Sequence, residues 1–124
     1  MEVRAAVSST TMYRGHASSR WRLSPGLYRS AAFHQEQNLV RDALRIAPSE
    51  FVGLSDFQRL AKMQHFGLRT RLLDVTENPL VALYFACHAE AFEDGVVFIF
   101  TNLPTFVEDA TLVSVAMRFV FSGS

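Results

Sequence analysis

The pattern of apolar and polar positions divides the chain into several short regular elements. Residues 10–15 combine threonine with apolar and aromatic side chains and end in Tyr-Arg-Gly, which predicts a short strand that leads into a loop. Residues 34–46 place apolar side chains at helical spacing among polar ones, and Pro48 stops a helix from continuing. This part of the chain therefore predicts one strand and one amphipathic helix.

A second helix is predicted over residues 56–66. Ser55 is a favoured N-cap residue, the apolar side chains after it recur at helical spacing, and Gly67 supplies a C-terminal stop. Residues 68–76 are too few and too irregular for another helix, so they predict an extended segment.

A third helix is predicted to begin at Pro79, with Asn78 as its N-cap. Proline suits the first turn of a helix because the backbone N–H that it lacks has no partner there. Helical spacing assigns large side chains and the cysteine to the buried face of this helix. These residues are Leu80, Leu83, Tyr84 and Cys87.

The clearest strand signal lies at residues 95–101, where valine, isoleucine and phenylalanine follow one another between turn residues. Such a run predicts a central strand. Residues 112–121 alternate more weakly and are compatible with one further strand. Together the elements predict an α+β fold, with a small mixed or antiparallel sheet and two or three helices.

Length and charge narrow the class of protein. A chain of 124 residues predicts a single domain over residues 1–124, and its 12 basic and 12 acidic residues give a formal net charge of zero. No global field therefore attracts nucleic acid or an anionic membrane, so nucleic-acid binding is disfavoured and any anion site has to be local. Lys62 is the only lysine, and the other basic residues are arginines, which bind phosphate or carboxylate through two bonds.

Cysteine content and the two ends of the chain favour a cytoplasmic protein. Cys87 is the only cysteine, so no internal disulfide can form. No segment has the apolar length that a signal peptide or a membrane-spanning helix needs, so no membrane partner is expected. The apolar run before residue 122 has no closing element, which suggests a truncated chain that meets a missing C-terminal segment or a protein partner.

The densest polar chemistry lies in residues 64–86, where glutamine, histidine, arginine, aspartate and threonine alternate with apolar residues. A buried polar group without a partner costs about 1 to 3 kcal/mol. The run is therefore either an internally satisfied network or a ligand site.

Four blocks of sequence carry a resemblance to a known family. They are Tyr13-Arg14-Gly15, the run from Trp21 to Arg29, residues 64–76 and residues 78–86. In order and spacing these blocks resemble the FRG domain, which is found in bacterial and phage-related proteins. Three positions depart from the pattern of that family, because Tyr13 replaces phenylalanine, Arg69 replaces proline and Val75 replaces tryptophan.

A second similarity connects the same residues with mono-ADP-ribosyltransferases. It implies that Arg14 grips the phosphates of NAD, the substrate, and that Thr76, with Asp74, shapes the nicotinamide pocket. Cleavage of the bond to nicotinamide builds positive charge on the ribose, so the reaction needs a nearby carboxylate. No acidic residue lies on an assigned final strand, and the catalytic residue is unknown at this stage. The acids considered are Glu77, Glu90, Glu93, Glu108 and Asp109.

The candidate ligand-binding residues come from all four blocks. Each also has a structural interpretation. Arg14 can be a surface or ion-paired arginine, and His65 can be a cation that the C-terminus of a helix favours. Arg71 and Asp74 form either a buried pair that shapes the loop or ligand contacts. The candidates are Tyr13, Arg14, Gly15, Arg29, Gln64, His65, Arg71, Asp74, Thr76 and Asn78.

Three other residue types receive structural interpretations. Trp21 is expected in the core or in a pocket wall, and Cys87 is expected to be a small core residue. The histidines lack cysteine or carboxylate partners in a known ligand pattern, so no metal site is expected.

The resemblances imply recognition of a nucleotide such as NAD, with ADP-ribosyl transfer or NAD cleavage as the hypothesised reaction, in bacterial conflict or phage defence. Two alternatives stay open. One is a noncatalytic module that binds a phosphate or a protein partner through its arginines. The other is a degraded copy in which the motif survives as scaffold.

Overall fold

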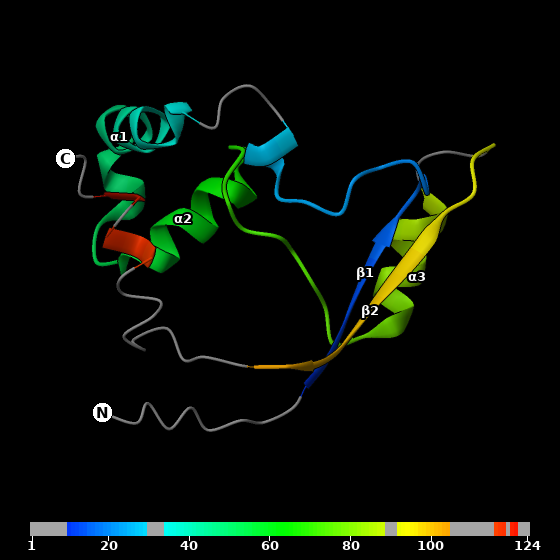
Figure 1. Cartoon of the computed structure of the whole chain (residues 1–124). Coiled ribbons are helices and arrows are strands. Elements are labelled where there is room, and N and C mark those ends of the chain that lie inside the picture. Colours follow the sequence, from blue (N-terminus) through cyan, green and yellow to red (C-terminus); the bar gives the residue numbers. More distant parts are fainter. Residues whose placement is uncertain (1–9, 30–33, 89–91, 105–115, 119, 122–124) are drawn as a thin grey trace. The chain divides into compact units, whose positions relative to one another are not determined.

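The structure is a computed structural model in which two compact units are distinguished (Figure 1). Unit 1 comprises Met1–Leu23 and Asp74–Phe106, and unit 2 comprises Ser24–Leu73 and Val107–Ser124. The expectation of a single domain for the whole chain stays a prediction. The residues that the structure describes are 10–29, 34–88, 92–104, 116–118 and 120–121.

Unit 1 contains an antiparallel pair of strands, β1 (Thr10–His16) and β2 (Val96–Leu103). Both coincide with strands that the sequence predicts. Their register places Arg14 opposite Phe98 and Gly15 opposite Val97. Since successive side chains of a strand point to opposite faces, Arg14 and Gly15 belong to different faces of the pair.

The predicted central position of the second strand is wrong for the described part of the chain. There the sheet has two strands, and it is β1 that has a neighbour on each edge, because Thr76 forms an isolated antiparallel bridge with Tyr13. This bridge ends the segment predicted to be extended, and residues 68–75 indeed contain neither helix nor strand.

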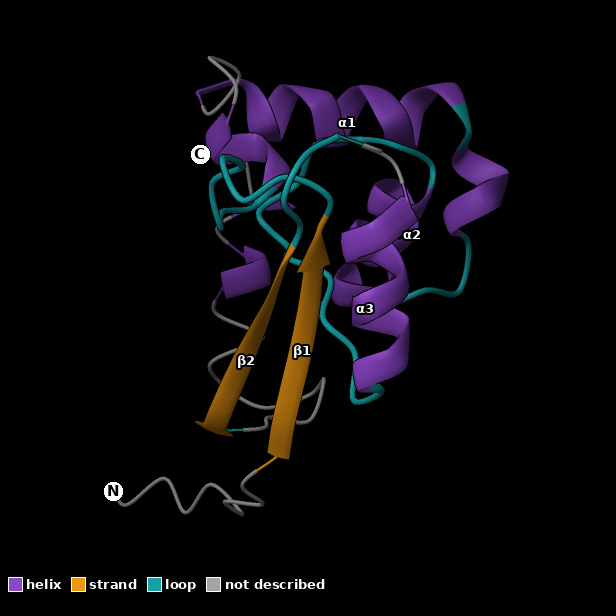
Figure 2. Cartoon of the chain, turned by 90° about the vertical axis from the view of Figure 1, so that its right-hand side faces the viewer, coloured by secondary structure: helices purple, strands orange, loops and turns teal. Residues whose placement is uncertain are grey.

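Helix α3 (Pro79–His88) lies along one face of the β1–β2 pair (Figure 2). It begins as the sequence predicts, with Asn78 Oδ1 accepting a hydrogen bond from the Leu80 backbone N–H at 2.9 Å. The contact with β1 is made by backbone, since a Cβ atom at Gly15 would collide with the Ala82 carbonyl oxygen and stand 2.8 Å from the Ala86 nitrogen. Glycine is thus required where the helix meets the strand.

The predicted buried face of α3 is wrong. The side that faces the strands carries the two alanines, Ala82 and Ala86, which are 0% and 8% exposed. A helix pressed this closely against a strand leaves no depth for leucine or tyrosine, so the large side chains lie outside. The exposed residues that the sequence placed in the core are Leu80, Leu83, Tyr84 and Cys87.

Unit 2 is helical, and its two main helices match the prediction. The first, α1 (Glu36–Ile46), follows the amphipathic pattern and ends just before the short 3-10 helix η3 (Pro48–Phe51). The second, α2 (Asp56–His65), begins with a capping box, in which Ser55 and Gln58 each accept a hydrogen bond from the other's backbone N–H. A further 3-10 helix, η1, spans Gly26–Arg29.

The core of unit 2 explains why the predicted strand over residues 112–121 is wrong. Residues 116–118 and 120–121 are helical, whereas residues 112–115 and 119 lie outside the described part. Met117 and Val120 are three positions apart, a spacing that puts both on one face of a helix, and they are 6% and 1% exposed. The buried cluster that they join also contains Val40, Phe51, Leu60 and Met63.

None of the helices in the described part of the chain combines the length and the apolar character that crossing a membrane requires.

Candidate functional site

The candidate residues fall into two groups, one in each unit. Each group is defined by contacts within its own unit. Unit 1 holds Tyr13, Arg14, Gly15, Asp74, Thr76 and Asn78, and unit 2 holds Arg29, Gln64, His65 and Arg71.

In unit 1, the two sequence blocks that hold the candidates lie side by side. The Tyr13 backbone N–H donates to the Thr76 carbonyl at 2.7 Å, and the Thr76 N–H donates to the Tyr13 carbonyl at 2.8 Å. This reciprocal pair joins positions that are 63 residues apart in the sequence. The segment from Asp74 to Asn78 therefore runs next to the strand that carries Arg14.

Arg14 is oriented by two hydrogen bonds to uncharged acceptors. Its Nε donates to His16 Nε2 at 2.9 Å, and its Nη1 donates to the Asp74 backbone carbonyl at 2.6 Å. Because a guanidinium only donates, His16 accepts at Nε2 and its imidazole is neutral, with the proton on Nδ1. The two bonds fix the direction of the guanidinium.

The other candidates in unit 1 have structural roles. Gly15 forms the contact with α3 described above. Thr76 Oγ1 accepts a hydrogen bond from the Asn78 N–H at 3.1 Å, and Asn78 caps α3. These two polar side chains order the turn that enters the helix, beside the backbone carbonyl that holds Arg14.

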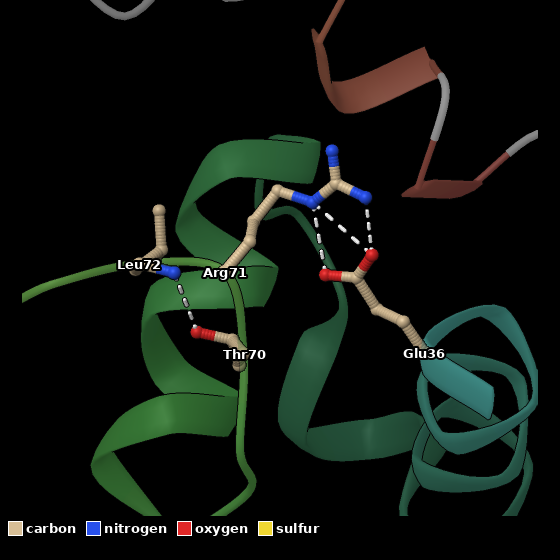
Figure 3. Close-up of polar contacts among 4 residues, drawn as sticks. All are labelled: Glu36, Thr70, Arg71 and Leu72. Carbon is tan, nitrogen blue, oxygen red and sulfur yellow. Dashed lines mark hydrogen bonds and ion pairs between the residues drawn. The ribbon is translucent and has the colours of Figure 1, made fainter. Parts of the chain in front are cut away.

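In unit 2, Arg71 forms a bidentate pair with Glu36 (Figure 3). Arg71 Nε lies 3.0 and 3.1 Å from the two carboxylate oxygens, and Nη2 also donates to Oε2. The Glu36 side chain is 5% exposed and that of Arg71 is 23% exposed. The hydrogen bond with Glu36 raises the pKa of Arg71 above its ordinary value, against a smaller lowering by burial. The expected pairing of Arg71 with Asp74 stays a prediction, and Asp74 is exposed.

Gln64 also takes part in the internal network of unit 2. Its Oε1 accepts a hydrogen bond from the hydroxyl of Thr70, which is 3% exposed. Thr70 Oγ1 in turn accepts from the Leu72 N–H at 3.1 Å (Figure 3). The Thr70 carbonyl accepts from the Leu27 N–H at 3.1 Å. This is the satisfied internal network that the sequence allowed as one interpretation of the polar run.

The remaining two candidates of unit 2 lie on its surface. His65 is the last residue of α2, at the helix end where the sequence places it, and Arg29 is the last residue of η1. Both are exposed.

Sequence reasoning missed a cluster that ties the loop after β1 to the start of β2. The hydroxyl of Ser18, a residue 2% exposed, donates to Glu93 Oε2, and Arg20 forms an ion pair with the same carboxylate. His16 was likewise overlooked as a partner of Arg14. The spacing of Arg14 and His16, two residues apart in a strand, could have indicated their contact. Ser18 and Glu93 are 75 positions apart, so the sequence gives no local signal for theirs.

The acids considered for catalysis are only partly described. Glu77 is exposed before α3, and Glu93 is held by Ser18 and Arg20. Glu90, Glu108 and Asp109 lie outside the described residues. Among the residues that are described, no group of three or more histidine, cysteine or acidic side chains could hold a metal ion.

A hollow of about 490 Å³ opens in unit 1 between the end of α3 and the start of β2. Cys87, which was expected in the core, is exposed and lies in its wall. The other lining residues are Leu83, Ala86, Glu93, Asp94, Gly95 and Val97.

The fold and the motif positions define a small α+β protein built around an Arg-Gly strand end and a capped helix that packs on it. In a comparison with protein families, the model of the FRG domain matches residues 9–95 of the 124. The chain belongs to the FRG domain family. No curated protein and no solved structure matches it.

Proposed function

We propose that this FRG domain binds a nucleotide such as NAD, with Arg14 as the residue that receives its phosphates. The observation that supports the proposal is the orientation of Arg14 by His16 Nε2 and the Asp74 carbonyl. A guanidinium carries five N–H donors and a permanent positive charge, so a phosphate oxyanion is a complementary ligand for it. A prepositioned guanidinium can form the paired hydrogen bonds that phosphate oxygens accept.

Charge is consistent with a local rather than a global anion site. The formal net charge of the chain is zero, so affinity for a phosphate has to come from individual arginines. Arg71 is a weak choice, because its guanidinium already forms a bidentate pair with the carboxylate of Glu36.

The proposed reaction is cleavage of the bond between the ribose of NAD and nicotinamide. Nicotinamide leaves with the bonding electron pair, and the ribose carbon then bonds to water in NAD cleavage or to an acceptor group in ADP-ribosyl transfer. Positive charge develops on the ribose, so a carboxylate close to it would lower the barrier. The likeness to ADP-ribosyltransferases and the role in bacterial or phage defence rest on the family resemblance.

A noncatalytic role is the second candidate, and a specific observation favours it. Gly15 makes the close contact with α3, and Arg14 binds the backbone of the neighbouring segment. Both residues of the motif therefore contribute to the fold of unit 1. The fold would therefore need both residues even in a binding module or a scaffold without catalytic activity.

Thermal unfolding with and without NAD tests the binding proposal. A ligand at 100 times its dissociation constant adds about 2.7 kcal/mol to the free energy of unfolding. We expect this stabilisation for the wild type and for Arg45→Gln, which alters an exposed arginine of α1, but not for Arg14→Gln. Equal stabilisation of all three proteins, or of none, contradicts the proposal. Release of nicotinamide from NAD by the wild type then separates the catalytic candidate from the noncatalytic one.

A further inference from the structure

The face of the β1–β2 pair opposite α3 gathers aromatic rings around Arg14. By the register, this Arg14 face consists of Met12, Arg14, His16, Val96, Phe98 and Phe100. His16 binds the Arg14 Nε, and its ring lies edge-on to Phe98, with the ring centroids 5.0 Å apart. A cation and aromatic surfaces therefore lie together on one side of the strands, away from the glycine contact with α3.

Trp21 extends this aromatic surface toward solvent. Its ring centroid lies 6.1 Å from that of His16, with the planes tilted by 53°. His16 is 2% exposed, but Trp21 is 44% exposed. The indole thus contacts the imidazole that orients Arg14 and still presents a large part of its surface to solvent.

The loop that carries Trp21 is fastened at several points. The Trp21 N–H donates to the Ser18 carbonyl at 3.2 Å, and the Ser19 N–H donates to the Asp94 carbonyl at 2.7 Å. Ser18 and Arg20 both bind the carboxylate of Glu93. An aromatic side chain on a loop held in this way loses little conformational freedom when a planar ligand stacks on it.

We propose that Trp21 is the surface on which the base of the bound nucleotide stacks, while Arg14 holds its phosphate. This inference rests on the proposed function and adds a requirement for an aromatic base. His16 contacts both groups, through a hydrogen bond with Arg14 Nε and a ring contact with Trp21. A nucleoside monophosphate joins its base and its phosphate through a single ribose, so it can bind two residues that share one neighbour.

The occupant follows from the chemistry of this face. A phosphate complements the guanidinium, and a planar base complements the exposed indole, because every base has a flat face that stacks on an aromatic side chain. Pyrophosphate alone would contact Arg14 and leave Trp21 unused. A nucleotide contacts both residues.

Fluorescence provides a direct test, because Trp21 is the only tryptophan of the chain. AMP and nicotinamide mononucleotide are titrated separately, with ribose 5-phosphate and pyrophosphate as ligands that lack a base. We expect saturable quenching by at least one of the two nucleotides and no quenching by the ligands that lack a base. Saturable quenching has to disappear in Arg14→Gln.

Affinity measured by calorimetry tests the same inference without the reporter. Trp21→Ala should weaken binding of the quenching nucleotide about tenfold, Trp21→Phe should stay within about threefold, and both should bind pyrophosphate like the wild type. Unchanged pyrophosphate affinity shows that Trp21→Ala retains the folded Arg14 site. Tyr84→Ala, which removes an exposed ring from α3, serves as the matched control and should change neither affinity.

The outcomes separate this inference from the proposed function. Binding that depends on Arg14, without quenching and without any effect of Trp21→Ala, overturns the base-stacking role and leaves nucleotide phosphate binding intact. Absence of binding to nucleotides and pyrophosphate alike overturns both.

Discussion

Gly15 of β1 lies so close to the Ala82 carbonyl of α3 that a Cβ atom at position 15 would overlap it. Gly95, which immediately precedes β2, repeats this relationship with the Ala86 carbonyl. The glycines and the alanines together allow the helix to rest directly on the strands. The glycine of the family motif is therefore explained by packing, and the arginine before it is left facing the other side.

Replacement of Gly15 by alanine should unfold or severely weaken unit 1. Overpacking typically costs about 1 to 3 kcal/mol, and we expect the upper end or more because the obstacle is backbone that cannot move aside. Gly26→Ala is the matched control, since its nearest neighbour is the Arg69 side chain at 3.5 Å, an ordinary contact. Urea unfolding of both variants measures the difference. Equal stability of the two variants would refute the close contact.

The buried face of α3 could not be predicted from the residues of the helix alone. The helix is apolar on all sides, so its own residues do not reveal which side is buried. Close contacts with Gly15 and Gly95 determine which side of α3 is buried. Neither glycine is part of the helix, so the spacing of Leu80 and Leu83 contains no information about these contacts. By contrast, the starts of α2 and α3 were predictable, because Ser55 and Asn78 act within a few residues of themselves.

The pair of Arg71 and Glu36 should be a main source of stability in unit 2. Removal of one partner leaves the other charge buried, at a cost of about 3 to 5 kcal/mol. We therefore expect a large loss of unfolding free energy in Arg71→Ala. Arg45→Ala, in which the exposed pair with Asp42 is lost, should cost less than about 1 kcal/mol. Similar losses in both variants would show that the Arg71 pair is not effectively buried.

The contribution of Arg71 to the free energy of unfolding should not change as the pH rises from about 7 to about 9. A raised pKa means that the stabilisation is fully present below the ordinary pKa of arginine and is lost only as the pH rises through the higher pKa of the folded state. The difference in unfolding free energy between wild type and Arg71→Ala should thus be equal at about pH 7 and about pH 9. A difference that shrinks toward pH 9 would contradict the charged pair as its cause.

Asn78 should act as a helix cap, and the size of its effect should follow that role. Asn78→Ala removes the acceptor of the Leu80 N–H and should cost about 1 kcal/mol. Asn78→Ser supplies another capping oxygen and should recover most of that loss. If nucleotide affinity falls in both variants although stability is retained in the serine variant, Asn78 contacts the ligand itself, as the sequence-based hypothesis holds.

Ser18 should contribute more than Arg20 to the free energy of unfolding, through the loop before Trp21. Ser18→Ala removes a buried hydroxyl that donates to a carboxylate, and we expect a loss of about 1 to 3 kcal/mol. The Arg20 side chain is 78% exposed, so Arg20→Ala should cost less than about 1 kcal/mol. Thermal unfolding compares the two directly. A larger loss in Arg20→Ala would reverse this ranking.

The candidate site was predictable in part. The sequence placed Arg14, Asp74 and Thr76 in one functional group, and the pairing of Tyr13 with Thr76 indeed aligns their segments. It did not indicate that Arg14 binds the carbonyl of Asp74, because every residue has a carbonyl and none is distinctive in a sequence. Nor did it select Glu36 for Arg71, since the two positions are 35 residues apart.

The most direct test of the account follows the Nε–H signal of Arg14 by NMR while pyrophosphate or NAD is added. The bond to His16 Nε2 should protect this proton from exchange, and absence of the signal in Arg14→Lys identifies it. We predict a saturable shift of this signal with both ligands. Shifts confined to exposed arginines such as Arg45 and Arg29, with the Arg14 signal unmoved at saturating ligand, would contradict the claim that Arg14 receives the phosphate.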